Sequence, residues 1–486
     1  MKKGIKIVFV VLLMSLLFAA CVTDYADYND TEAEPASYAE DDEVGEVEVA
    51  VAPGLWDYMF IWPEGRDREW EEDVISFAQA FLFVHPLMRN VQIPITDVQS
   101  ILSDADSGGN MDLFHDAALR ERFLEHIHEL IAVIPELEDH AIIFSLSEIA
   151  ALLEDAHTGF MLDRHTFRDF ESHYYPFFFT HFSDGFFVDR VNLPADYEHA
   201  LDSRLVAING VRMDEIIGLA ANVIPHENTH DIAARLSLFD LLRHSEFLMH
   251  LGVTDGGEAE FMFESPAGDM FSITTSPHAE EEAETLSSSI DREALLTHSR
   301  PDWQWYEFLE EYNMMYVRLY NFFRAIGAPA FGEIYQSLAE ETRYILDTGA
   351  IDRFVVDLRG NRGGFLNEFD MLFDLIYAER NRIRSVYVLM DRHTYSSGVI
   401  AAAILREYID EVLLVGEPTS QPPNFFAAPS TYWLHNAGIS FTVSSVHFHI
   451  LPEYPGNALY PDIRIPMTFE DFKNGRDPVL EAVLSG

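Results

Sequence analysis

The spacing of apolar residues divides the chain into a helical first part and a mixed second part. In residues 56–154 apolar side chains recur every three or four positions, most clearly over 119–134 and 137–153, which predicts amphipathic helices. Residues 174–277 carry short apolar runs that are typical of strands. From residue 314 onward, strand-like and helix-like runs alternate, which indicates an α/β layer with parallel pairing.

Two segments of the mixed part share one form, in which an apolar strand runs into a sharp turn and then a helix. The first strand, residues 354–358, ends at a glycine-rich turn that contains Gly363 and Gly364. The second strand, residues 386–390, leads into a polar loop that places Ser396 at the start of an Ala-rich helical run. A turn that exposes backbone N–H groups and a serine at a helix N-terminus are two parts of an acyl-transfer site.

The residues of these two segments also resemble a known family. The phrases DLRGNRGG (357–364) and HTYSSG (393–398) resemble the catalytic core of the C-terminal processing and tricorn-type serine peptidases. LEDAHTGF (153–160), LVGEPT (414–419) and YPDI (460–463) extend the resemblance, which covers the chain from Asp155 to its C-terminus. It implies a crotonase-like ββα spiral, hydrolysis of peptide or protein substrates, and no cofactor or metal.

The resemblance implies a serine nucleophile, and the residues then narrow the choice of its base. In the processing peptidases the base is a lysine, at the position that Pro422 occupies here. Beyond residue 21 the chain contains one lysine, Lys473, so a Ser–Lys dyad is not expected. The tricorn-like branch uses an upstream histidine, and His157 in the DAHTG phrase matches its place. His157 is therefore the expected base, although the chain has 20 histidines and a structural helix-end role is the alternative.

Adjacent serines compete for the role of nucleophile. The Thr-x-Ser-small pattern of the family selects Ser396 over Ser397. The backbone N–H of Ser397 is then one expected donor of the oxyanion hole, and the N–H of Gly363 or Gly364 is the second. His393, three residues before Ser396, is expected to line the loop rather than act as the base.

A third catalytic residue should orient the histidine. The tricorn-like branch keeps a glutamate near the end of the chain, and Glu453, 57 residues after Ser396, is the expected counterpart. Asp462 and Glu417 are its rivals. The resemblance thus implies a triad of Ser396, His157 and Glu453.

Residues 226–230 (HENTH) match the H-E-x-x-H signature of zinc proteases. That chemistry needs both histidines one turn apart on a formed helix. Here Pro225 precedes the motif, and its third and fourth residues are good helix caps but poor interior helix formers. A helix should therefore begin around residues 229–231, so that His226 and His230 lie on either side of its start. Zinc proteolysis remains the alternative to the serine mechanism.

The N-terminus has the form of a targeting segment. Three lysines precede an apolar run over residues 7–20 that is short for a membrane span. Small residues before Cys21, the only cysteine, resemble a bacterial lipoprotein box. This resemblance implies cleavage and lipid attachment at Cys21, and hence an extracytoplasmic protein anchored to the cell membrane; ordinary secretion is the alternative.

Composition and patterning complete the expected organisation. The chain has 82 acidic and 31 basic residues, which argues against nucleic acid and anionic membrane surfaces as partners. The oligomeric state is left open. A non-catalytic binder on the same scaffold is the alternative from another class, whereas an esterase or lipase would need a G-x-S-x-G elbow. The expected regions are a signal peptide (1–21), an acidic tether (22–55), a helical domain (56–168), a PDZ-like β module (169–277), an acidic linker or flap (278–303) and the catalytic core (304–486).

Overall fold

The computed structural model describes most of the chain after the acidic tether. The described residues are 65–89, 116–279, 285–287, 295, 302–323 and 331–485. The predicted signal peptide, the lipidation site at Cys21, the acidic tether and most of the predicted linker at 278–303 lie outside them. None of the helices in this described part is long and apolar enough to cross a membrane.

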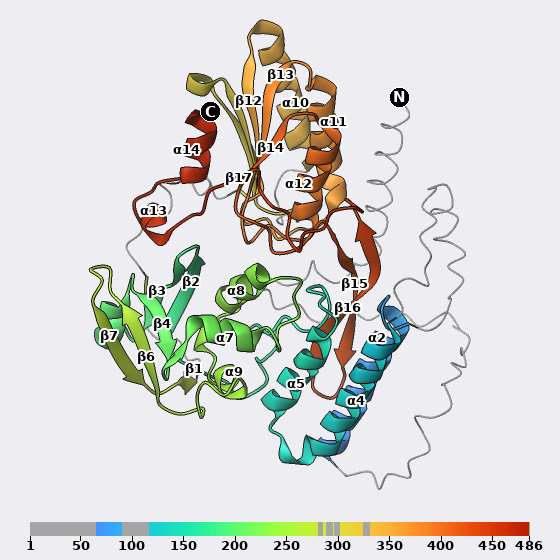
Figure 1. The fold of residues 1–486 in the computed structure, drawn as a ribbon, viewed down its shortest axis with the longest axis vertical. Coiled ribbons are helices and arrows are strands. Elements are labelled where there is room, and N and C mark those ends of the chain that lie inside the picture. Colours follow the sequence, from blue (N-terminus) through green and yellow to red (C-terminus); the bar gives the residue numbers. More distant parts are fainter. Residues whose placement is uncertain are drawn as a thin grey trace, which may run out of the picture.

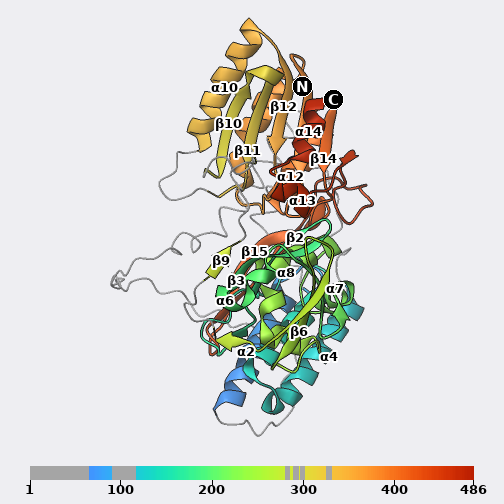
Figure 2. The ribbon, with the colours of Figure 1, turned by 90° about the vertical axis from the view of Figure 1, so that its left-hand side faces the viewer.

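The C-terminal part of the chain forms a six-stranded sheet covered by helices on both faces. The strand order is β10-β11-β12-β13-β14-β17, and every neighbouring pair is parallel except β10 with β11. Figure 2 shows α10 and α14 on opposite sides of this sheet. The elements are β10 (Gln304–Leu309), β11 (Met314–Leu319), α10 (Phe331–Thr348), β12 (Ile351–Asp357), α11 (Asp370–Glu379), β13 (Ile383–Met390), α12 (Ser397–Tyr408), β14 (Val412–Gly416), β17 (Ile463–Arg464) and α14 (Pro478–Ser485).

The central strands of this sheet are apolar because both of their faces are buried. In β12, Phe354 and Val356 pack in the core shared with α10, α11 and α12, whereas Val355 points to the opposite core, which α14 closes. Successive side chains of a strand point to opposite faces, so a strand buried on both sides reads as a continuous apolar run. The predicted α/β layer with parallel pairing is confirmed.

A second sheet, of seven strands, follows the helical region in the chain. Its path is β2-β3-β4-β6-β7, with β5 paired to β4 and β9 paired to β3. The predicted Asn-Gly turn is present between β4 and β5, where Asn209 and Gly210 have φ angles of 48° and 78°. The strands are β2 (Phe177–Phe182), β3 (Gly185–Asn192), β4 (Arg204–Ile208), β5 (Val211–Arg212), β6 (Ala259–Glu264), β7 (Met270–Thr275) and β9 (Thr285–Ser287).

Among the described residues, four α-helices interrupt this β region: α6 (Pro194–Tyr197), α7 (Met213–Ala220), α8 (Thr229–Leu238) and α9 (Ser245–His250). The sequence pattern predicts only α8. Helices as short as α7 and α9 are stabilised by tertiary packing rather than by intrinsic propensity, so their periodicity is a weak signal. The region is therefore a mixed α/β unit rather than a purely stranded one.

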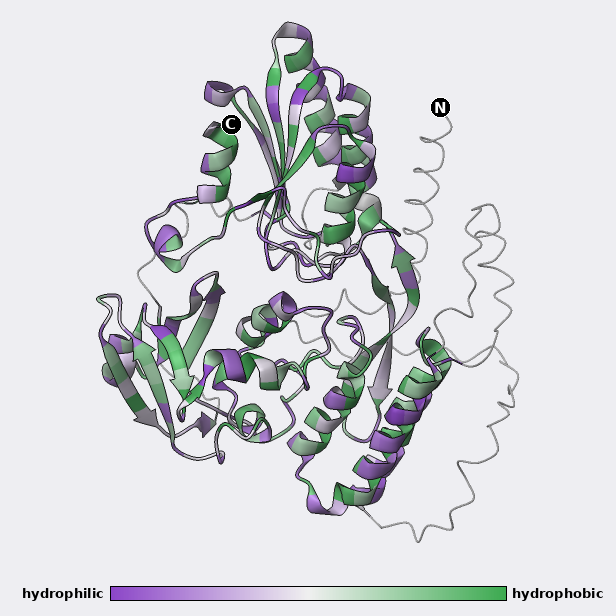
Figure 3. Cartoon of the chain, viewed as in Figure 1, coloured by the Kyte–Doolittle hydropathy of each residue, from purple (hydrophilic) through white to green (hydrophobic). Residues whose placement is uncertain are grey.

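One hydrophobic core unites the N-terminal helices, the second sheet and the tip of a long hairpin. It includes Phe77 of α2, Phe144 of α5, Phe261 of β6 and Phe441 of the hairpin. The hairpin descends from the first sheet to the helices (Figure 1), and hydrophobic and hydrophilic residues alternate around α4 (Figure 3). The N-terminal helices and hairpin strands that contribute to this core are α2 (Arg66–Val84), α4 (Ala117–Val133), α5 (Asp139–Ala151), β15 (Asn424–Leu434) and β16 (Ile439–His449). The predicted boundary near residue 168 thus crosses a continuous core.

Candidate active site

Ser396 occupies the turn between β13 and α12. It is the N-cap of α12, with φ 52° and ψ −125°, a conformation that is strained for a residue with a side chain. Its backbone N–H donates to Oε1 of Gln421 at 2.6 Å, which helps to hold this strained turn. Because its own side chain makes no capping bond to α12, the hydroxyl remains available for chemistry at a helix N-terminus.

The structure brings His157 to Ser396 from the other half of the molecule. Nε2 of His157 lies 3.0 Å from Oγ of Ser396, although 239 residues separate the two in the chain. The loop that carries His157 is held by β16, because Thr442 donates its hydroxyl to the carbonyl of His157 and exchanges two backbone bonds with Gly159. This distance is within the hydrogen-bond reach that a general base needs.

Aromatic rings fix the plane of the His157 imidazole. The ring is stacked against Tyr395 with centroids 4.6 Å apart and against Phe425 at 5.4 Å. Burial, with the charges of Arg235 and Arg362, lowers the pKa of His157 to about 4, although the charges of Asp155 and Asp231 oppose this shift. His157 is therefore neutral near pH 7, which is the state that accepts a proton from a serine hydroxyl.

Asp155 shapes the loop around His157. One carboxylate oxygen accepts the backbone N–H of His157 at 2.9 Å, and the other accepts Thr158 Oγ1 and lies 3.1 Å from Nε2 of His85. Burial raises the pKa of Asp155, but the hydrogen bond and charge of His85 outweigh it, so that the pKa is lowered overall. Asp155 thus builds the turn that presents His157.

The glycine-rich turn packs directly against the nucleophile. A Cβ atom on Gly363 would lie 2.6 Å from Cβ of Ser396, so only glycine fits there, and its φ of 97° agrees. The N–H of Gly363 donates to Oδ1 of Asn361 at 2.8 Å and is already engaged. Within the described residues the N–H groups of Gly364 and Ser397 have no such partner. Of the expected oxyanion donors, these two are left to receive a ligand.

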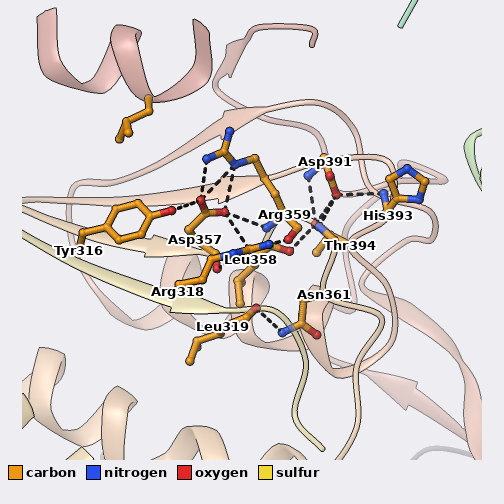
Figure 4. Close-up of polar contacts among 12 residues, drawn as sticks. Tyr316, Arg318, Leu319, Asp357, Leu358, Arg359, Asn361, Asp391, His393 and Thr394 are labelled. Atoms are coloured by element: carbon orange, nitrogen blue, oxygen red, sulfur yellow. Dashed lines mark hydrogen bonds and ion pairs between the residues drawn. The ribbon is translucent and has the colours of Figure 1, made fainter. Parts of the chain in front are cut away.

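Buried polar bonds join the two active-site turns below the nucleophile. Figure 4 shows Asp357, at the end of β12, contacting Tyr316 and Arg359, while Oδ1 of Asp391 accepts the backbone N–H of His393. Asp391 Oδ1 also accepts the N–H of Gly360 at 2.9 Å, which ties one turn to the other. His393 therefore lies in the supporting loop, as the sequence predicts.

Among the described residues, none of the three candidate acids makes a hydrogen bond to His157. Glu453 is exposed in the segment after β16, and no hydrogen bond from it is present among the described residues. Glu417 is paired with Arg392, and Asp462 is paired with Arg406 at 2.6 Å. The role of Glu453 stays a prediction that needs a direct test.

The HENTH segment adopts the cap geometry that the sequence predicts. Helix α8 begins at Thr229, and the side chain of its N-cap, Asn228, accepts the N–H of Asp231 at 3.1 Å. His226 precedes the helix and its Nδ1 lies 2.7 Å from the carbonyl of Ile224, so it does not share a helical face with His230. The paired histidines of a zinc-protease helix are not formed.

Sequence reasoning missed two residues beside the reactive pair. Gln421 touches the backbone of Ser396, and a carboxylate oxygen of Glu227 lies within 4.8 Å of both His157 and Asp155 at their ligand atoms. Gln421 is the second residue after the GEPT phrase, and Glu227 is the acid of the HENTH motif. Both residues belong to motifs that the sequence shows, but nothing in the sequence indicates that either segment contacts Ser396 or His157.

Comparison with known proteins shows the fold. No protein-family model matches the chain, and no curated protein sequence matches it. The structure is similar to that of mature CPAF complexed with lactacystin, with a TM-score of 0.50 and 11% identity over 86% of this chain and 97% of that one. A mutant of CPAF gives the same TM-score and identity over 86% and 96%. The photosystem II D1 C-terminal processing protease covers 82% of this chain and 93% of its own at 14% identity, with a TM-score of only 0.34. The chain thus shares its overall fold with CPAF.

Proposed function

We propose that this protein is a serine peptidase that hydrolyses internal peptide bonds of peptides or proteins. The observation that carries the proposal is the 3.0 Å approach of His157 Nε2 to Ser396 Oγ at the N-terminus of α12. Ser396 is 6% exposed, and the His157 imidazole is neutral near pH 7. Among the described residues, the backbone N–H groups of Gly364 and Ser397 have no hydrogen-bond partner. The resemblance of the two core motifs to serine peptidases and the fold shared with CPAF support the same reading.

The chemistry follows from these positions. Ser396 Oγ attacks the scissile carbonyl while His157 Nε2 takes the hydroxyl proton, and His157 then returns that proton to the leaving amine. The carbonyl oxygen becomes negative in the tetrahedral intermediate and receives hydrogen bonds from the N–H groups of Ser397 and Gly364. Water repeats the sequence to release the acyl group. Glu453 is the family-based candidate for the acid that completes the triad.

A fluorophosphonate probe tests this proposal without knowledge of the substrate. We expect stoichiometric labelling of Ser396, mapped by mass spectrometry, and no labelling of the Ser396→Ala variant. Digestion of peptide mixtures by the wild type, and not by Ser396→Ala, then shows peptidase activity and its cleavage preference. An unlabelled Ser396 in a folded protein would instead support the non-catalytic binder on the same scaffold.

We further propose an architecture and location consistent with this activity. The six-stranded sheet with its following helices is assigned to a crotonase-like catalytic core, and the second sheet with its Asn-Gly hairpin to a PDZ-like module. The N-terminal motif assigns a lipid anchor to Cys21 outside the cytoplasm. Incorporation of labelled palmitate into the wild type but not into a Cys21→Ser variant tests the anchor.

A further inference from the structure

Within the part of the chain that the structure describes, several buried side-chain atoms around His157 have no hydrogen-bond partner. They are Nδ1 of His157, the hydroxyl of Tyr395 and both carboxylate oxygens of Glu227. Part of the Glu227 side chain reaches the surface, yet its two oxygens are buried. Buried polar groups are nearly always paired, so unpaired groups in one place need an explanation, and a functional role is one of them.

The His157 ring and the Glu227 carboxylate also lie close together. A ring nitrogen of His157 and one oxygen each of Glu227 and Asp155 lie within 4.8 Å of one another. Nε2 of His157 is occupied by Ser396, which leaves Nδ1 as the nitrogen in need of a partner. Asp155 already receives the backbone N–H of His157, Thr158 and His85. Glu227 is the remaining acceptor.

The fold holds Glu227 in this position from both sides. Its neighbour Asn228 donates its amide to the carbonyls of Thr419 and Asn457 at 3.1 and 2.8 Å, which attaches the start of α8 to the catalytic half. About two turns into α8, Arg235 donates to the carbonyl of Ala156, beside His157, at 2.8 Å. The helix cap of the HENTH segment thus delivers its glutamate to the base.

We propose that Glu227 is the positioning residue of His157, accepting a hydrogen bond from Nδ1–H and stabilising the imidazolium that forms when Ser396 attacks. This inference rests on the proposed peptidase function. The carboxylate fixes the tautomer in which Nε2 is free to accept the serine proton, as the third member of a triad does. No proton leaves the imidazole at Nδ1, so Glu227 acts through charge and orientation.

The surroundings of Glu227 disfavour a negative charge on its carboxylate in the resting enzyme. Burial raises the pKa of Glu227 well above its usual value, and the charges of Asp155 and Asp231 raise it further, whereas Arg235 and the backbone of Ala156 lower it. Arg362 and Tyr395 also face this cluster. A cation on His157 would relieve this unfavourable burial, so the Glu227 carboxylate interacts more strongly with the transition state than with the resting enzyme.

The test compares the rate at which fluorophosphonate labels Ser396 in the wild type, Glu227→Gln and Glu227→Asp. We expect Glu227→Gln to slow labelling and to lower kcat by about a hundredfold or more, with KM nearly unchanged. The limb of the kcat/KM profile that follows the ionisation of Glu227, whose pKa is raised by burial, should disappear in Glu227→Gln, because a glutamine side chain stays neutral at every pH. Glu227→Asp, which keeps the charge, should recover part of the rate. Glu215→Gln, an exposed glutamate on α7, is the matched control and should behave as the wild type.

The outcomes separate this inference from the function on which it rests. Absence of wild-type labelling refutes the peptidase proposal itself. Labelling of Glu227→Gln at the wild-type rate refutes the role of Glu227 alone, and a loss seen instead in Glu453→Gln assigns that role to Glu453. Stoichiometric zinc that is lost in Glu227→Gln would make the cluster a metal site and overturn the inference.

A second measurement keeps the test decisive if Glu227→Gln does not fold. In the ¹⁵N-histidine-labelled wild type, Nδ1–H of His157 should give a strongly downfield proton resonance, assigned by its loss in His157→Ala. Absence of that resonance from the folded wild type would contradict a carboxylate bond at Nδ1.

Discussion

Two buried carboxylates of this molecule, Asp357 and Glu227, have opposite surroundings. Asp357 accepts bonds from Tyr316, Arg359 and Arg318, and although burial raises its pKa, the charges of Arg359 and Arg318 lower the pKa to about 2. Among the described residues the Glu227 carboxylate has no side-chain hydrogen-bond partner, and burial raises its pKa well above the usual value. The Asp357 carboxylate is fully paired in the resting protein. The Glu227 carboxylate is proposed to pair with the positive charge that forms on His157 during the reaction.

The contrast indicates that one carboxylate stabilises the fold and the other takes part in the reaction. The Asp357 cluster lies at the end of β12 and continues through Arg359 to Asp477, next to α14. It therefore holds the glycine-rich turn in place from below. Glu227 comes from a loop of the other half, and the reactive pair forms only where the two halves meet. The Asp357 cluster stabilises the fold, whereas the buried Glu227 carboxylate lacks a compensating positive charge until His157 is protonated.

The largest expected effect concerns the reactive pair itself. Ser396→Ala and His157→Ala should each lower turnover by about four orders of magnitude, as the loss of a triad member does. Lys473→Ala should be almost silent, because its amine is exposed and paired with Asp202 at 2.8 Å. Steady-state turnover and melting temperature are measured together, so that a folding defect is recognised. Activity that survives in His157→Ala but not in Lys473→Ala would reverse the choice of base.

The next largest effect should come from breaking the satisfied cluster. Asp357→Asn leaves Arg359 and Arg318 without their buried counter-charge and should lower the free energy of unfolding by about 3–5 kcal/mol. Urea unfolding followed by circular dichroism measures this loss. Asp410→Asn, an exposed aspartate after α12, is the control and should change stability little. A loss at Asp357 no larger than the loss at Asp410 would mean that the two clusters do not differ in their support of the fold.

The two carboxylates should also respond to pH with opposite signs. The pKa of Asp357 is lowered in the folded state, so its stabilisation is present above pH 3.8 and is lost as the pH falls toward about 2. The pKa of Glu227 is raised, so its contribution is full below pH 4.5 and is lost as the pH rises through the folded value. Glu227→Gln should therefore raise stability at neutral pH, by about 1–3 kcal/mol, and change it little at pH 4.

Melting temperatures of the wild type and both variants between pH 3 and 8 test this difference. The destabilisation by Asp357→Asn should grow as the pH rises from 3 to 5, whereas the stabilisation by Glu227→Gln should grow only at higher pH. Parallel curves for the two variants would show that Glu227 is paired in solution.

The smallest expected effect is that of chelators. EDTA should leave peptidase activity unchanged, because His226 and His230 lie on either side of the start of α8 and cannot form a zinc-protease helix. Metal content and turnover are measured before and after dialysis. Stoichiometric zinc whose removal abolishes activity would move the active site to His226, Glu227 and His230.

Local sequence patterns predicted many of the strands, helices and turns around the site. The apolar runs ending at residues 358 and 390 correspond to β12 and β13, and the Ala-rich run corresponds to α12. The cap chemistry of Asn228 and Thr229 correctly placed the start of α8. These features depend on contacts within a few residues, which is why periodicity, glycine positions and capping residues reveal them.

The sequence by itself determined the elements, the turn that requires Gly363, and, through its motifs, the candidates Ser396 and His157. Only the tertiary structure decided that these two side chains meet at 3.0 Å, that the N–H of Gly363 is engaged, and that a carboxylate oxygen of Glu227 lies within 4.8 Å of a ring nitrogen of His157. The physical reason is that each of these contacts joins segments far apart in the chain. Their approach depends on how the hairpin, α8 and the two sheets pack, and local sequence carries no record of that packing.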